Sequence, residues 1–141
     1  MIKKRILAAV SSTLIIALSG VSQAAELELY PQINKGGSLS DGVRIATGRI
    51  VCRDAHSGFH IWINAQKAGD QSEYIIKGKT NSKHEIRVRL GGYGWTESKV
   101  KEQYGMVRSG TEERAIFDVF LDGEQYVDPD EYVLSVHGLC L

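Results

Sequence analysis

The apolar segment at the end of the chain, Tyr132-Val133-Leu134-Ser135-Val136-His137-Gly138-Leu139-Cys140-Leu141, most constrains the fold. Tyr132, Leu134 and Val136 recur at every second position, which predicts a β-strand with one buried face. A strand this apolar normally has a partner strand on both sides. Because no further segment follows it in this sequence, we expect one of the two partners to come from another chain.

The first 24 residues have the pattern of a secretory leader, and residues 25–141 are expected to form one domain. Three basic residues open the leader, and the apolar stretch Ile6–Leu18 follows them. Ser22-Gln23-Ala24 fits the small-x-small rule for cleavage, so we expect the cut after Ala24. An uncleaved membrane anchor is disfavoured because a dozen or so apolar residues are too few to span a bilayer comfortably.

Cleavage would also change the charge of the protein. The full chain has 17 basic and 17 acidic residues. The leader contains basic but no acidic residues, so the mature chain is mildly acidic, with a net charge of about −3. Since no basic stripe is present, nucleic acid is not expected as a partner.

The two cysteines, Cys52 and Cys140, are expected to form one disulfide in the oxidising compartment that a leader implies. Closing so long a loop stabilises a fold by about 4–5 kcal/mol in the chain-entropy model. The spacing also leaves open a Cys₂His₂ zinc site made with His56 and His137. The disulfide is the favoured alternative, and we therefore expect neither a metal nor a cofactor.

Short alternating segments predict an all-β fold, and no segment keeps a helical period. Strands are expected over residues 25–30, 43–52, 58–64, 73–77, 83–90, 114–121 and 132–141. A phase break at Gly48 suggests a β-bulge or a switch between sheets there. The charged segment from Thr96 to Thr111 is expected to be an irregular, mobile loop. Six or seven strands in a domain of this length indicate an Ig-like β-sandwich.

The expected sandwich is incomplete. The strand from Tyr132 corresponds to strand F of an Ig-like fold, with Tyr132 near the position of the aromatic corner, and no strand G follows it. An apolar groove would then remain open, lined by Val43, Ile45, Tyr132, Leu134 and Val136. Such a groove is an aggregation hazard unless a strand from another protein fills it.

The run from Asp41 to Trp62, Asp-Gly-Val-Arg-Ile-Ala-Thr-Gly-Arg-Ile-Val-Cys-Arg-Asp-Ala-His-Ser-Gly-Phe-His-Ile-Trp, resembles the D-type subunit of Afa/Dr adhesins. It also resembles the minor subunit of aggregative adherence fimbriae. Gly91–Trp95, Phe117–Val119 and Glu131–Val136 with Cys140 extend the resemblance over nearly the whole mature chain. It implies an Ig-like domain that lacks its last strand, is completed by donor-strand complementation, and acts as an invasin in host-cell attachment and uptake.

The resemblance also implies partners and a location. A periplasmic chaperone, an outer-membrane usher and a major subunit that donates an N-terminal strand are expected. The chain would pass through the periplasm to the fimbrial tip on the cell surface. A host receptor is implied as well, for which an integrin is a candidate, although the sequence contains no Arg-Gly-Asp tripeptide.

The N-terminal arm of the mature chain is short. Its alternation lasts only from Leu27 to Tyr30 before Pro31, a reach of about 20 Å for six residues. A donor strand needs more length, so we expect a chain terminator that accepts a strand and donates none.

Candidate receptor residues are Tyr93, Trp95, Lys99, Lys101 and Arg108. The alternative is that the aromatic residues cap one end of the sandwich and the charged residues solvate a loop. Trp62 is expected to pack in the core or on a sheet face rather than to bind a ligand.

Catalysis has little support in the sequence. No nucleophile elbow, phosphate loop or zinc-protease motif occurs. Asp118 lacks an identifiable acidic or basic partner, so a structural hydrogen-bonding role is expected. Two alternatives to a fimbrial subunit stay open: a free secreted receptor-binding module, which completes its own sandwich or swaps strands as a dimer, and a small secreted hydrolase.

Overall fold

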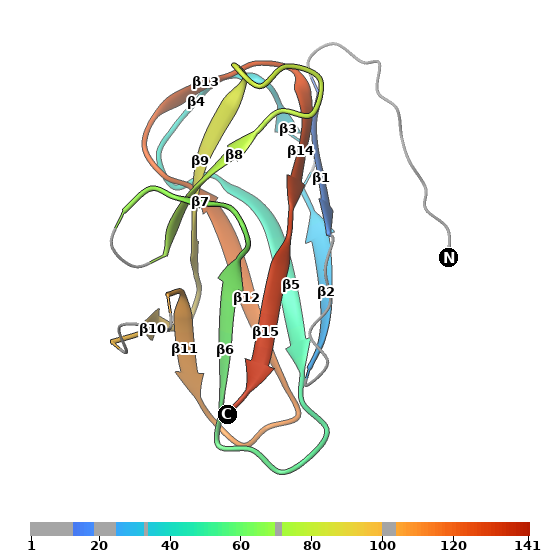
Figure 1. Ribbon diagram of the computed structural model, residues 1–141, viewed down its shortest axis with the longest axis vertical. Helices are drawn as coiled ribbons and strands as arrows, with labels where there is room; N and C mark the ends of the chain where they lie inside the picture. Colours follow the sequence, from blue (N-terminus) through green and yellow to red (C-terminus); the bar gives the residue numbers. More distant parts are fainter. Residues whose placement is uncertain (1–12, 19–24, 33, 70–71, 100–103) are drawn as a thin grey trace.

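The computed structural model describes residues 13–18, 25–32, 34–69, 72–99 and 104–141, and all regular elements in these ranges are strands (Figure 1). The strands are β1 (Thr13–Leu18), β2 (Glu26–Pro31), β3 (Asn34–Lys35), β4 (Gly37–Leu39), β5 (Arg44–Val51), β6 (Gly58–Ile63), β7 (Gln66–Lys67), β8 (Glu73–Lys77), β9 (Glu85–Gly91), β10 (Thr96–Glu97), β11 (Met106–Ser109), β12 (Arg114–Leu121), β13 (Gln125–Val127), β14 (Asp130–Leu134) and β15 (Val136–Cys140). None of these ranges contains a helix long and apolar enough to cross a membrane.

The larger sheet has six antiparallel strands in the order β2-β5-β12-β9-β8-β7. Alternation along β12 places Phe117 and Val119 in the core, whereas Ile116 and Asp118 face outward. Asp118 accepts a hydrogen bond from the Thr47 hydroxyl at 3.0 Å, which is the structural role expected for it. The strand predicted over residues 114–121 is therefore confirmed with the same bounds.

The smaller sheet has the order β10-β11-β6-β15 and packs against the larger one. Phe59, Ile61 and Ile63 of β6 point inward and are almost fully buried with the core side chains of β5 and β12. The sandwich has the two-layer, antiparallel arrangement expected from the alternating sequence.

A third sheet, in the order β14-β1-β3, lies along one side of the sandwich (Figure 1). β1 runs parallel to β14, with residues Leu14 to Leu18 opposite Asp130 to Leu134. β1 lies within the segment that the sequence predicts to be a leader. The strand-F edge thus has a partner, and that partner comes from the N-terminal part of this chain.

The structure corrects two expectations about strand boundaries. The last strand was expected to be continuous, but it divides at Ser135 into β14 and β15, which pair with different neighbours. The segment Met106–Ser109 was expected to be loop, yet it forms β11 and pairs with β6. Only Met106 is buried in this four-residue strand, so its sequence shows no clear period.

The expected bulge lies elsewhere. The register between β12 and β5 shifts at Val119 and Phe120, which face Ala46 and Arg44, so the extra residue is Ile45. Gly48 has a different role, because a Cβ atom there would lie 2.2 Å from the ring carbon Cζ of Phe117. The glycine therefore makes room for a core aromatic ring.

The aromatic corner is confirmed at Tyr132. Its hydroxyl donates a hydrogen bond of 2.6 Å to the carbonyl oxygen of Asp128, four residues upstream. We expect Tyr132→Phe to lower the free energy of unfolding by about 1–2 kcal/mol, since a partly buried carbonyl loses its donor. Urea denaturation would measure the loss, with Tyr126→Phe as the control because Tyr126 is 68% exposed. Equal effects of the two substitutions would contradict the role of the corner.

Candidate strand-acceptor site

The candidate site is the edge of β14. Tyr132, Leu134 and Val136 are fully buried and face the core. On one side, the turn after β8 contacts β14: Gly78 bridges to Tyr132, and the Lys79 amide donates to the Glu131 carbonyl at 2.9 Å. On the other side, β1 is the single strand partner of β14 among the residues described. β1 thus occupies the side of β14 that the turn after β8 leaves open.

The other two predicted groove residues lie in the larger sheet or just before one of its strands. Ile45 lies in β5 and is fully buried, and Val43 just before it packs partly buried against the core. β5 is an inner strand, with β2 and β12 on its two sides. Contact of Val43 and Ile45 with an added strand stays a prediction.

A buried carboxylate fixes the start of β14. The side chain of Asp130 has no exposed surface and accepts hydrogen bonds from the Thr80 amide at 3.0 Å, the Thr80 hydroxyl at 2.8 Å, and the Glu131 amide at 2.6 Å. His84 Nδ1 lies 2.9 Å from Oδ2 of Asp130, the oxygen that also accepts from the Thr80 hydroxyl. Burial acts to raise the pKa of Asp130, but these hydrogen bonds outweigh it and hold the pKa well below its usual range.

Sequence reasoning missed this cluster. Asp130 lies between two segments expected to be strands, and nothing in the sequence distinguishes it from other aspartates at such positions. Thr80 and His84 lie in the β8–β9 turn, which packs beside β14 only in the folded chain. The cluster therefore joins that turn to the acceptor strand.

The predicted disulfide between Cys52 and Cys140 is confirmed, with Cα atoms 5.8 Å apart. Cys52 follows β5 and Cys140 ends β15, so the bridge links the two sheets at the end of the sandwich far from Asp130. Both sulfur atoms are bonded to each other, and the zinc alternative consequently has no thiolates.

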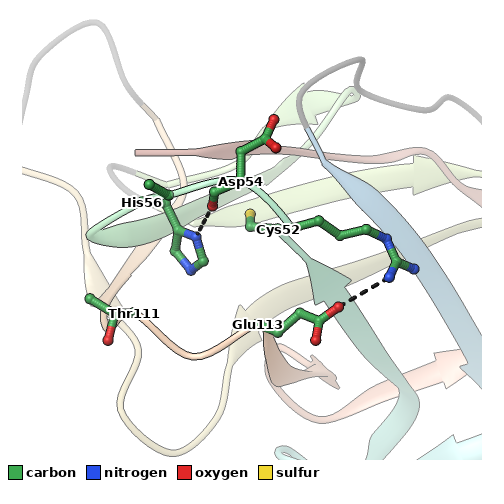
Figure 2. A pocket seen from close by; sticks show the side chains of 7 residues that line it. Cys52, Asp54, His56, Thr111 and Glu113 are labelled. Carbon is green, nitrogen blue, oxygen red and sulfur yellow. Dashed lines mark hydrogen bonds and ion pairs between the residues drawn. The ribbon is translucent and has the colours of Figure 1, made fainter.

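A surface pocket beside the disulfide is lined by Cys52, Arg53, Asp54, Ala55, His56, Thr111 and Glu113 (Figure 2). The His56 ring lies between two backbone carbonyls, with Nδ1 2.7 Å from the Asp54 oxygen and Nε2 2.7 Å from the Glu112 oxygen. These two carbonyls raise the pKa of His56, because a ring that donates through both nitrogens is protonated. Both ring nitrogens of His56 thus face backbone carbonyls of this chain.

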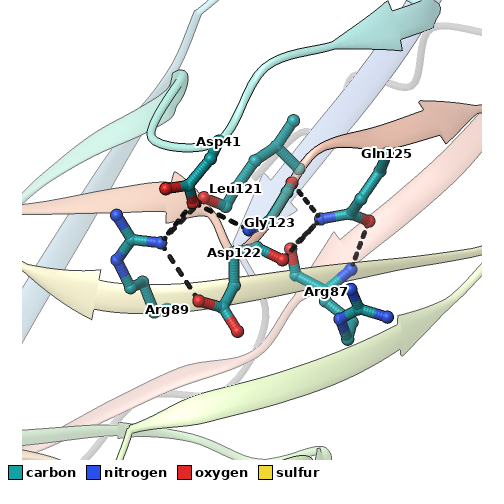
Figure 3. Close-up of polar contacts among 7 residues, drawn as sticks. All are labelled: Asp41, Arg87, Arg89, Leu121, Asp122, Gly123 and Gln125. Atoms are coloured by element: carbon teal, nitrogen blue, oxygen red, sulfur yellow. Dashed lines mark hydrogen bonds and ion pairs between the residues drawn. The ribbon is translucent and has the colours of Figure 1, made fainter.

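A second polar cluster closes the opposite end of the larger sheet (Figure 3). Arg89 Nη1 donates to carboxylate oxygens of Asp41 at 2.9 Å and Asp122 at 3.1 Å. The Gly123 amide donates to the same Asp41 oxygen at 2.8 Å, and together with Arg89 it lowers the pKa of Asp41. These charges satisfy one another and tie the β4–β5 and β12–β13 turns to β9.

The four described receptor candidates differ in exposure. Tyr93 is 90% exposed at the tip of its turn, and its carbonyl accepts a 2.7 Å hydrogen bond from Arg108. Trp95 is buried near Phe59 and Phe117, and its Nε1 donates to the Ile116 carbonyl at 2.8 Å, which is the packing role left open for it. Lys99 is exposed, and Lys101 lies outside the described residues.

Comparisons with known proteins agree with this architecture. The family model of the Enterobacteria AfaD invasin protein matches residues 35–138. Protein AggB of Escherichia coli is 46% identical over 141 residues, which covers 100% of this chain and 97% of that protein. The crystal structure of HdaB, the minor tip subunit of the E. coli Hda pilus, has a TM-score of 0.78 at 40% identity and covers 82% of each chain.

A structure that concerns fibronectin binding and biofilm formation by AAF fimbriae of enteroaggregative E. coli has a TM-score of 0.76 at 47% identity. The match covers 83% of this chain and 85% of that one. An all-β, Ig-like sandwich of the kind found in fimbrial subunits is confirmed. The chain belongs to the AfaD invasin family, so the resemblance seen in its sequence is confirmed as well.

Proposed function

We propose that this chain is the minor subunit at the tip of an adhesive fimbria, where it accepts a donor strand along β14 and promotes host-cell adhesion and invasion. The observation that carries the proposal is the pairing of β14 with β1 over five residue pairs. β14 presents buried apolar side chains inward and a backbone edge that takes an additional strand. β-Strand addition at such an edge gives affinity through main-chain hydrogen bonds.

Processing of the leader would make this edge available. Cleavage after Ala24 removes Thr13–Leu18 and leaves the backbone of residues 130–134 without its β1 partner. The same edge could then receive a strand from a periplasmic chaperone during export and, at the usher, the N-terminal strand of the major subunit. The domain limits, residues 1–24 and 25–141, and the export route are parts of this proposal.

The chain is also proposed to end the fibre rather than extend it. The arm expected to be too short for donation is β2, and all six of its residues pair with β5. An arm that is part of its own larger sheet is not free to enter a neighbour. Residues 25–34 are thus expected to donate no strand, and binding of a peptide with this sequence to another subunit would contradict the assignment.

Receptor binding is the second part of the proposal. The relatives suggest fibronectin as a ligand to test, since it is named for AAF fimbriae, and an integrin is the other candidate receptor. Tyr93 and Arg108 offer an exposed aromatic ring on a turn that a hydrogen bond holds in place. The proposal assigns the chain no enzymatic reaction.

Co-purification from the surface of cells that express the whole fimbrial operon tests the proposal. We expect a chain that begins at Ala25 by mass spectrometry, in a complex with the major subunit that resists detergent until it is heated. A full-length, uncleaved chain without associated subunits would contradict it. Deletion of the major subunit's N-terminal arm is the matched control and should abolish the complex.

A further inference from the structure

The outer face of the smaller sheet differs from that of the larger sheet in charge. Residues that face outward from the larger sheet include a charged one on each longer strand: Glu28 on β2, Arg49 on β5, Asp118 on β12, Arg87 on β9 and Lys77 on β8. Outward positions of the smaller sheet are Thr96 on β10, Val107 and Ser109 on β11, His60 and Trp62 on β6, and His137 and Leu139 on β15. Within the described strands, none of these seven is Asp, Glu, Lys or Arg.

Three rings lie next to one another on this face. The Trp62 ring is 4.8 Å from the His60 ring and 5.8 Å from the His137 ring, to which it is nearly parallel at 14°. His60 is held from below, with Nε2 3.1 Å from the Tyr104 carbonyl, and His137 Nε2 lies 3.2 Å from the Ser135 hydroxyl. One neighbour on the same strand and one on the adjacent strand therefore restrict the orientation of Trp62.

His60 is buried at 4% exposure, with its Nε2 against the Tyr104 carbonyl, whereas the other outward side chains of the face keep exposed surface. Leu139 is 38% exposed and Leu141 is 45% exposed. Trp62 and His137 are half-buried, and Asn64 is exposed at one end. A charge-free surface of aromatic and neutral polar groups is unusual for the solvent face of a sheet and is typical of recognition sites.

The dimensions select the kind of ligand. Three interstrand gaps of about 4.8 Å and the length of β6 give a face of roughly 14 by 20 Å, or about 300 Å². A stable protein–protein interface needs about 800 Å² on each partner. The face is thus too small for a second copy of this chain and suits a ligand of a few rings.

We propose that this face, named the Trp62 face, binds a neutral oligosaccharide. One side of a pyranose ring carries C–H groups that pack against an aromatic ring, and its hydroxyls pair with neutral polar side chains. Trp62 would supply the stacking surface, and His137 and Asn64 the hydrogen bonds. The absence of a formal charge on the face argues against sialylated or sulfated sugars. The sequence alone predicted that Trp62 packs in the core or on a sheet face. Binding is indicated by the neighbouring rings and the uncharged outward positions of the folded sheet.

Saturation-transfer NMR on the full chain tests the proposal with lactose, maltose, cellobiose and mannobiose as neutral probes and sialyllactose as the charged one. At least one neutral disaccharide is expected to bind saturably in the millimolar range and more tightly than sialyllactose. Trp62→Ala should weaken that binding at least tenfold and His137→Ala several-fold. Ile116→Ala is the matched control, since Ile116 is 50% exposed on the outer face of the other sheet and should leave binding unchanged.

Three results would overturn the proposal: no binding of any neutral probe, binding that both substitutions leave intact, or tighter binding of sialyllactose. A fourth contradicting result would come from analytical ultracentrifugation. If the wild type self-associates and Trp62→Ala does not, the face is an interface between copies of this chain. Far-UV circular dichroism shows whether Trp62→Ala has folded, and His137→Ala keeps the test valid if it has not. Donor-strand acceptance takes place at β14, so failure here leaves the proposed function unaffected.

Discussion

Replacement of both Cys52 and Cys140 by alanine is expected to lower the free energy of unfolding by about 4 kcal/mol. The bridge closes a loop of 88 residues, and its loss restores the conformational freedom of that loop in the unfolded chain. For a domain of this size the loss corresponds to a melting temperature lower by roughly 15–20 °C. Calorimetry of the two proteins under the same conditions measures it.

Reduction provides the matched control for this prediction. Dithiothreitol should destabilise the wild-type protein by nearly the same amount and leave the double variant unchanged. A loss below about 1 kcal/mol would contradict the account, since it would mean that β15 is held in place without the bridge. Hydrogen exchange at β15 should rise in the variant, because the strand has one strand partner, β6, within the described part of the chain.

Asp130→Asn is expected to lower the free energy of unfolding by about 3 kcal/mol at pH 7. Asparagine has one acceptor oxygen, whereas the carboxylate accepts from Thr80, Glu131 and His84 through two. The pKa of Asp130 is held below its unfolded value, so the carboxylate stabilises the fold fully above about pH 4 and less as the pH falls below that value. The difference in free energy of unfolding between the variant and the wild type should therefore shrink from pH 4 to pH 2.

Urea titrations at pH 7, 4 and 3 measure this dependence. Asp54→Asn is the control, because Asp54 is exposed and the substitution should change stability little. If the difference in free energy of unfolding between the wild type and Asp130→Asn stays constant from pH 7 to pH 3, Asp130 is not a buried, ionised group.

Alternation predicted the strands that cross the middle of the sandwich, because one buried face leaves a period of two in the sequence. Arg114–Leu121 and Gly58–Ile63 are of this kind. It failed at Met106–Ser109, a strand between β10 and β6, because four residues are too few to show a period. It failed again at Ser135, since the division between β14 and β15 follows from their neighbours and not from their own residues.

The candidate site was predictable in part. The buried residues Tyr132, Leu134 and Val136 and the disulfide follow from local pattern and compartment. The Asp130 cluster and the Trp62 face do not, since each is assembled from segments far apart in the sequence. His137 joins His60 and Trp62, which share one face of β6, only through the register between β6 and β15.

The most direct test of strand acceptance is the melting temperature of the chain that begins at Ala25, with and without a peptide that copies the N-terminal arm of the major subunit. A peptide that binds only the folded state should raise the melting temperature sharply, and the shift should reverse slowly on dilution. The same peptide with alternate backbone amides N-methylated cannot pair with β14 and should have no effect. A stable monomer whose melting temperature neither peptide changes would contradict the account, because its sandwich would be complete without a donor.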